Sequence, residues 1–309
     1  MAVQWAERFD EAGLTLFERG WLSSNNLLFV DGADSVLVDT GYCSHAEQTV
    51  ALVRHALAGV PLRRIVNTHL HSDHCGGNHA LQAAFDCEVI VPAAEAGKVD
   101  AWDETALSYR DTGQRCPRFR RTGTLRDGDC LTLGRREWRA LAAPGHDPES
   151  LVFYQPELRL LVAADALWEN GFGVVFPEIE GRRAFADVSS TIDRIASLAI
   201  DWVIPGHGLP FADVLGAIDR ARSRLKNWID APARHARHAA KVLVKFHLLE
   251  WRQRSRLDLD RWMAETRYLH LLQRTHFPTV RFDAWASGIV DELCRSGALR
   301  AQQGLVFDN

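Results

Sequence analysis

Four side chains that can ligate a metal stand within six positions of this 309-residue chain, in the segment HLHSDH that begins at His69. If the backbone stays extended, His69 and His71 point to the same side of the chain and can hold one metal ion together. A turn after them would then present Asp73 and His74 to a second ion. So dense a group of nitrogen and oxygen ligands indicates a metal site.

The remaining candidate ligands each follow a predicted strand. Such strands are expected at residues 64–66 before HLHSDH, 137–142 before His146, 159–163 before Asp165 and 202–204 before His207. Pro-Gly dipeptides precede both His146 and His207. Because loops at strand ends are where a rigid scaffold presents reactive groups, we expect these residues to meet at one edge of the sheets.

HLHSDH and the later His146, Asp165 and His207 resemble, in order and context, the HxHxDH signature and remaining ligands of the metallo-β-lactamase superfamily. The resemblance covers roughly residues 14–225. It implies an α+β fold, an αββα sandwich with two metal ions at one edge of its sheets. Its implied ligands are His69, His71 and His146 for one ion, Asp73, His74 and His207 for the other, with Asp165 bridging them.

The chemistry implied by the resemblance is hydrolysis of an ester, thioester or lactone of a small-molecule substrate by a metal-bridging hydroxide. Asp73 would be the catalytic residue, binding metal while orienting the water. Zinc is favoured on ligand type, with iron or manganese as alternatives. Asp165, where β-lactam-hydrolysing branches usually carry Cys or Ser, favours the hydroxyacylglutathione hydrolase and lactonase branches. The end of the chain lacks the glutathione-binding pattern of the former.

Two other reactions stay open. A basic C-terminal region resembles the winged-helix tail of superfamily members linked to RNA cleavage, which would make the chain a nuclease acting on RNA or DNA. In this chain the basic residues of that region alternate with acidic ones, so a solvated surface explains them better. Oxidation of a persulfide by a mononuclear iron site also occurs on this fold.

Domain organisation follows from a change in composition. From residue 211 onward the chain carries 17 Lys or Arg against 11 Asp or Glu, whereas the preceding part is acidic. Helices are predicted at residues 213–228, 241–252, 258–272 and 283–296, followed by a strand pair at 299–307. We therefore expect a catalytic domain over residues 1–225 and a winged-helix-like domain over 226–309.

The tail is predicted to shape the substrate pocket or to join two copies of the chain. The helix at 241–252 has a broad apolar face, including Leu243 and Phe246, which must be buried against the catalytic domain or against another subunit. A homodimer is the assembly that the second arrangement would give.

Other segments bear less directly on function. Residues 98–124 are either a lid or a helical surface excursion with solvated charges, and the second is favoured. Residues 168–183 are expected to be a mobile loop beside the metal site. No segment has the apolar length of a signal peptide or a membrane span, and the six cysteines form no close pair, so a cytoplasmic protein away from membranes is expected. Cys75, beside the cluster, is expected to be buried and inert. Ordinary roles are expected for His45, His55, His79, His235, His238, His247, His270 and His276.

Overall fold

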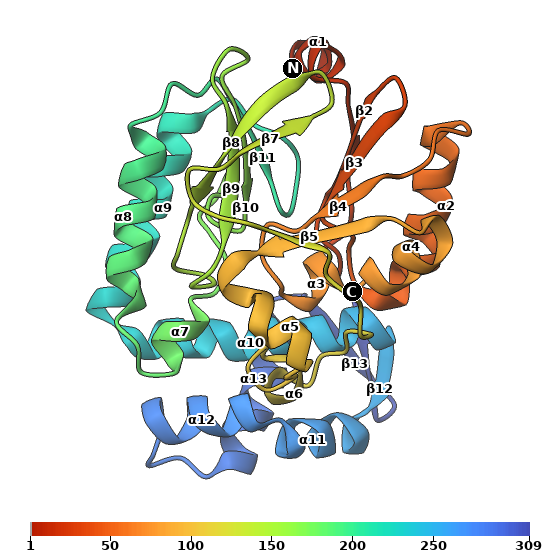
Figure 1. Ribbon diagram of the computed structural model, residues 1–309. Helices are drawn as coiled ribbons and strands as arrows, with labels where there is room; N and C mark the ends of the chain where they lie inside the picture. Colours follow the sequence, from red (N-terminus) through yellow and green to blue (C-terminus); the bar gives the residue numbers. More distant parts are fainter. Residues whose placement is uncertain (1) are drawn as a thin grey trace.

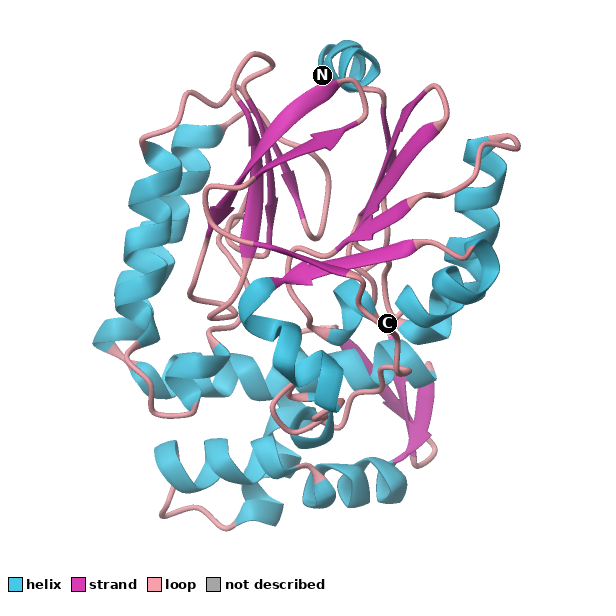
Figure 2. Cartoon of the chain, in the orientation of Figure 1, coloured by secondary structure: helices cyan, strands magenta, loops and turns pink. Residues whose placement is uncertain are grey.

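The computed structural model describes residues 2–309 and contains two β-sheets that face each other between layers of helices (Figures 1 and 2). The first sheet has the order β1 (Leu14–Phe17), β2 (Asn26–Asp31), β3 (Asp34–Val38), β4 (Arg64–Val66), β5 (Glu88–Pro92) and β6 (Gly123–Leu125). The second has the order β11 (Trp202–Pro205), β10 (Leu160–Ala164), β9 (Leu151–Gln155), β8 (Arg136–Ala142) and β7 (Cys130–Leu133). This is the predicted αββα sandwich.

Alternation along the strands explains the layers. Phe29 and Val36, which pair across β2 and β3, point into the space between the sheets and pack with Trp138 and Phe153 of the second sheet. Their neighbour Leu28 faces the opposite side and packs under the outer helices. Because both faces are covered at the centre of the second sheet, β9 and β10 are buried at every position, whereas β8 nearer the edge exposes Glu137 and Arg139.

The outer layers consist of two helices each. Helices α2 (Ala46–Leu57) and α4 (Asn78–Phe85) cover the first sheet, while α8 (Ala184–Ala196) and α9 (Val214–Asp230) cover the second (Figure 1). The remaining helices of this part of the chain are α1 (Ala2–Ala12), η1 (Cys43–His45), α3 (Ser72–Cys75), η2 (Ala93–Glu95), α5 (Ala96–Ala101), α6 (Tyr109–Thr112) and α7 (Phe176–Ile179). Among the described residues, no helix has the length and apolar character needed to cross a bilayer.

The C-terminal region is mainly helical, as predicted. It contains α10 (Pro232–Trp251), β12 (Gln253–Ser255), α11 (Arg256–Glu265), α12 (Arg267–His276), α13 (Phe282–Arg295), β13 (Leu299–Gln302) and β14 (Leu305–Asp308). A third sheet has the order β12-β14-β13, so a third strand joins the predicted pair. The division at residue 225 and the winged-helix description stay predictions.

One predicted helix, at residues 258–272, is wrong. The chain forms two helices there because Thr266 has an extended backbone, with φ −78° and ψ 107°. The carbonyl of Trp262 accepts both from the backbone N–H of Thr266 at 3.0 Å and from its hydroxyl at 2.7 Å, so α11 closes its last turn at this residue. Apolar spacing alone did not reveal this break.

Helix α10 is buried against the first part of the chain. Phe246 packs with Leu22 and Tyr42, and the Tyr42 and Phe246 rings lie edge to face at 5.1 Å. The Tyr42 hydroxyl also donates to Glu250 at 3.0 Å. The apolar face predicted at residues 241–252 is therefore covered, at these positions, within the same chain.

Candidate metal centre

All seven predicted ligands come together at the ends of four strands. The loop after β4 and the short helix α3 carry the HLHSDH segment, and the loops after β8, β10 and β11 carry the other three. Two groups of ligand atoms form, each with its atoms within 4.8 Å of one another. The first group contains His69, His71 and His146, and the second contains Asp73, His74, Asp165 and His207.

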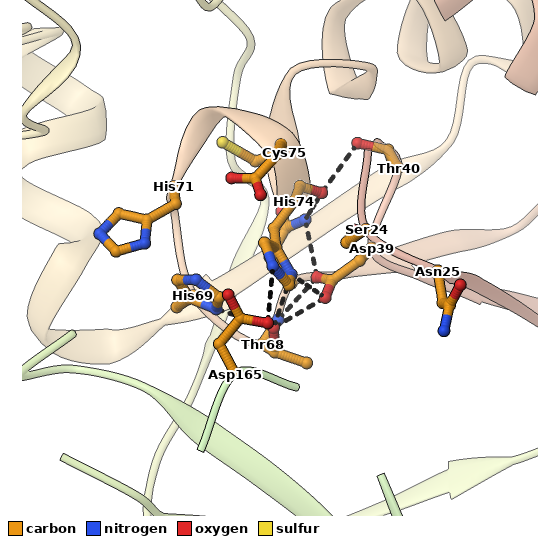
Figure 3. Close-up of polar contacts among 12 residues, drawn as sticks. Ser24, Asn25, Asp39, Thr40, Thr68, His69, His71, His74, Cys75 and Asp165 are labelled. Carbon is orange, nitrogen blue, oxygen red and sulfur yellow. Dashed lines mark hydrogen bonds and ion pairs between the residues drawn. The ribbon is translucent and has the colours of Figure 1, made fainter. Parts of the chain in front are cut away.

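Asp165 lies between the two groups. Its Oδ2 is 3.3 Å from Nε2 of His146 in the first group, and its Oδ1 is 3.5 Å from Nε2 of His74 in the second. Figure 3 shows His74 joined by dashed lines to Asp165 on one side and to Asp39 on the other. A carboxylate in this position has one oxygen available for each of two cations.

Burial decides the charge of the first group. It lowers the pKa of His71 and of His146 to about 4, and it lowers the pKa of His69 well below the usual value; neighbouring histidines add to the effect. Neutral imidazoles have the lone pair that a metal ligand needs. Three neutral rings around one point are therefore suited to a cation.

In the second group, charged neighbours outweigh burial in setting the pKa values. Burial lowers the pKa of His74, but Asp39 and Asp165 outweigh it and raise that pKa well above the usual value. Burial raises the pKa of Asp165, but His74 and His207 outweigh it and hold that pKa well below the usual value. The carboxylates thus attract a positive charge to this point, which a proton or a metal cation can supply.

Unpaired buried atoms test whether the residues suit a metal. Nε2 of His69 and Nε2 of His74 are buried, and neither makes a hydrogen bond in the part of the chain that the structure describes; Nε2 of His74 has only the ionic contact of 3.5 Å with Asp165. An unpaired buried polar atom costs about 1–3 kcal/mol, so such atoms are rare without a reason. Both nitrogens belong to the two ligand groups. The donor set therefore fits two metal ions.

Asp39, which the sequence analysis missed, supports the second group. Its carboxylate accepts hydrogen bonds from the backbone N–H of Thr68 at 2.9 Å, from the Thr68 hydroxyl at 2.7 Å and from Nδ1 of His74 at 2.7 Å. These contacts turn Nε2 of His74 toward the other ligands. The signal was present, since Asp39 directly follows β3 as Asp165 follows β10.

A cavity of about 460 Å³ opens above the two groups. Its wall contains Trp21, Trp168, Phe176, Val242, Phe246, Arg224 and His238, besides five of the seven ligands. Trp168 and Phe176 lie in the segment predicted to be a loop beside the metal site. His238 was expected to have an ordinary role, and only the approach of α10 brings it to the cavity.

Cys75 is buried, as expected, and is not part of either ligand group. Its sulfur lies 3.2 Å from the Tyr109 hydroxyl and 3.8 Å from the sulfur of Cys116. His235, also expected to be ordinary, accepts a hydrogen bond at Nε2 from the backbone N–H of Val175 at 3.1 Å.

Sequence comparison matches residues 19–207 to the family described as the metallo-beta-lactamase superfamily. A hydroxyacylglutathione hydrolase of Rhodospirillum rubrum is 28% identical over 146 residues, covering 46% of this chain and 50% of that protein. Another of that name, from Rhizobium etli, is 27% identical over 172 residues, covering 55% and 58%. The chain thus spans about half the length of these curated relatives.

Solved structures share the fold over nearly the whole chain. A metallo-beta-lactamase family protein from Thermus thermophilus has a TM-score of 0.55 and 23% identity, covering 96% of this chain and 99% of its own. A beta-lactamase domain protein from Burkholderia ambifaria has a TM-score of 0.57 and 21% identity, covering 96% and 92%. The helical C-terminal region is therefore part of the shared architecture.

Proposed function

This chain belongs to the metallo-beta-lactamase superfamily, and we propose that it is a dinuclear metal-dependent hydrolase of an ester, thioester or lactone. The observation that carries the proposal is the pair of ligand groups on the floor of the cavity, with Asp165 between them. A thioester is favoured because the curated relatives are named for cleaving an acylglutathione. The thiol part of the substrate is not assigned, since the glutathione-binding pattern is missing from the tail.

In this proposal His69, His71 and His146 would hold one ion, Asp73, His74 and His207 would hold the other, and Asp165 would be shared between them. Zinc is favoured, because imidazole and carboxylate ligands suit it. When bound, two such cations supply a water of near-neutral pKa and a Lewis acid for the substrate carbonyl.

The chain's own residues position the reactants. Oδ2 of Asp73 is 3.1 Å from Nε2 of His207, and Asp73 lines the cavity, so its carboxylate can accept a hydrogen bond from the attacking water and orient it. The Trp21 ring lies parallel to the His207 ring at 5.3 Å and limits where that ring can move. The apolar wall around these groups excludes other water and strengthens their electrostatic effects.

Metal content and hydrolysis of a simple thioester test the proposal together. The purified protein should contain two divalent ions per chain and should lose hydrolysis when a chelator removes them. His71→Ala and His146→Ala should each lose most of one ion and nearly all activity, because an incomplete set of ligands binds metal weakly. Full metal content with full activity in either variant would overturn the assignment.

A further inference from the structure

Arg224 on α9 lines the cavity without an acidic partner. The two neighbouring arginines on the same helix are paired, Arg220 with Asp213 at 2.9 Å and Arg222 with Asp193 at 2.7 Å. Arg224 forms no ion pair with any carboxylate of residues 2–309, yet it is half-buried and faces the cavity. Arg224 is therefore a cation in a cavity wall whose charge, unlike that of Arg220 and Arg222, is not balanced by a neighbouring carboxylate.

The protein holds the Arg224 guanidinium in place by contacts that carry no charge. One of its nitrogens donates to the carbonyl of Phe172 at 3.1 Å, and its carbon atom Cζ lies 5.6 Å from the centre of the Trp228 ring. Gly171 packs so closely that a Cβ there would lie 2.6 Å from Nε of Arg224. Since the guanidinium has five N–H donors and one bonds to the chain, donors remain for a ligand.

The loop that fixes Arg224 is also the loop that follows Asp165. Gly173 lies two residues after Gly171, and a Cβ at Gly173 would lie 2.4 Å from Nδ1 of His146. Arg224 and the metal ligands thus pack against one loop segment and line one cavity. A single molecule in that cavity can touch both.

The electrostatics of the wall favour an anion at Arg224. Burial lowers the pKa of its guanidinium, because the charged form loses water without gaining a partner. His238 beside it does not add charge, since burial, together with the charge of Arg224, lowers the pKa of His238 to about 4. Among the described residues that line the cavity there is no lysine and no second arginine. The acids of the lining are Glu169, at an exposed position, and Asp73 and Asp165, which belong to the ligand groups.

We propose that Arg224 binds a carboxylate of the substrate, remote from the bond that is cleaved, so that the preferred ester or thioester carries a negative charge. The substrate class rests on the hydrolase function proposed above, whereas the anion site itself does not. A carboxylate is the group that matches one guanidinium, because two parallel N–H donors bind its two oxygens. The apolar wall formed by Phe176, Val242 and Phe246 would surround the carbon chain between the two ends.

Binding of matched acids to the metal-loaded protein tests the site without relying on turnover. Calorimetry would compare glutarate, adipate, pimelate and suberate with pentanoate, hexanoate, heptanoate and octanoate. Each pair shares the carboxylate that can reach the metal ions and differs in the second carboxylate. At least one diacid should bind about tenfold more tightly than its matched monoacid, a preference of the size that one charge-assisted contact gives.

Variants assign the preference to Arg224. In Arg224→Gln the ratio of the two affinities should fall to about one, and in Arg222→Gln, the matched control outside the cavity, it should not change. Arg224→Lys keeps the charge but not the planar pair of N–H donors, so its ratio of diacid to monoacid affinity should be intermediate. If thermal unfolding shows that Arg224→Gln is misfolded, the ratio measured for Arg224→Lys tests the site instead. The site is refuted if no diacid is preferred, if the Arg224 variants keep the full ratio, or if Arg222→Gln loses it.

Hydrolysis of the corresponding neutral and carboxylated thioesters separates the two proposals. A diacid preference that depends on Arg224, with no turnover of any thioester, ester or lactone, would retain the anion site and reject the hydrolase function. Turnover without any carboxylate preference would retain the hydrolase function and reject the role of Arg224.

Discussion

The indole Nε1 of Trp168 donates a hydrogen bond of 3.1 Å to Oδ1 of Asp165. Asp165 is the carboxylate between the two ligand groups, and the same Oδ1 lies 3.5 Å from Nε2 of His74. Trp168 is therefore a positioning residue, because its hydrogen bond helps to fix the direction of this carboxylate.

Trp168→Phe should keep the fold and lower turnover about tenfold, because groups that orient metal ligands commonly contribute that much. The matched control is Trp21→Phe, which also shortens an aromatic side chain at the cavity, but one that stacks on His207 and has no hydrogen bond to Asp165. Metal content and kcat would be measured for both. Equal effects of the two substitutions would contradict a role for the hydrogen bond.

Asp39→Asn should weaken the second metal site about 10–100-fold, since Asp39 orients His74 through Nδ1. Asp34→Asn, at the other end of β3 and half-exposed, is the matched control and should leave metal affinity unchanged. Competition with a chelator measures the affinity. If Asp39→Asn holds both ions as tightly as the wild type, Asp39 does not support the site.

Gly206→Ala should remove metal binding at the second group. A Cβ at position 206 would lie 2.2 Å from Oδ1 of Asp165 and 3.0 Å from Cε1 of His74, so at least one of them must move. Gly97→Ala in α5 is the control, because no atom lies within 4 Å of its Cβ, and it should raise stability by about 0.5–1 kcal/mol. Elemental analysis and thermal unfolding distinguish the two outcomes; two bound ions in Gly206→Ala would contradict the close packing.

Acid should destabilise the fold through His235. Burial lowers the pKa of His235 from 6.5 to about 3, so the unfolded chain takes up a proton at a pH where the folded chain does not. The contribution of neutral His235 to the free energy of unfolding is complete above pH 6.5 and is lost as the pH falls toward 3. At pH 4 the loss is about 3 kcal/mol.

His235→Gln should therefore show a smaller fall in Tm between neutral pH and pH 4 than the wild type, since the amide oxygen can still accept from Val175 and does not titrate. His55→Gln, at an exposed position of α2, is the matched control and should follow the wild-type curve. Parallel curves for His235→Gln and the wild type would show that another group is responsible.

The spacing of residues within short segments was enough to predict several features of this protein. The strands that end before HLHSDH, His146, Asp165 and His207 predicted that the candidate ligands would meet at one edge of the sheets, whereas the αββα architecture was implied by the resemblance to the metallo-β-lactamase superfamily. Such features are visible in a sequence because alternation and strand ends are local properties of the chain. The same local signals failed at Thr266, where an extended backbone divides a predicted helix.

Only the tertiary structure decided which residues surround the candidate ligands. Asp39 reaches His74 across 35 positions of the sequence, and Arg224 reaches Phe172 across 52. Helix α10 brings His238 to a cavity whose floor is built largely from loops more than 60 residues away. Whether a side chain points into that cavity depends on how helices pack on sheets, and no pattern within one segment contains that information.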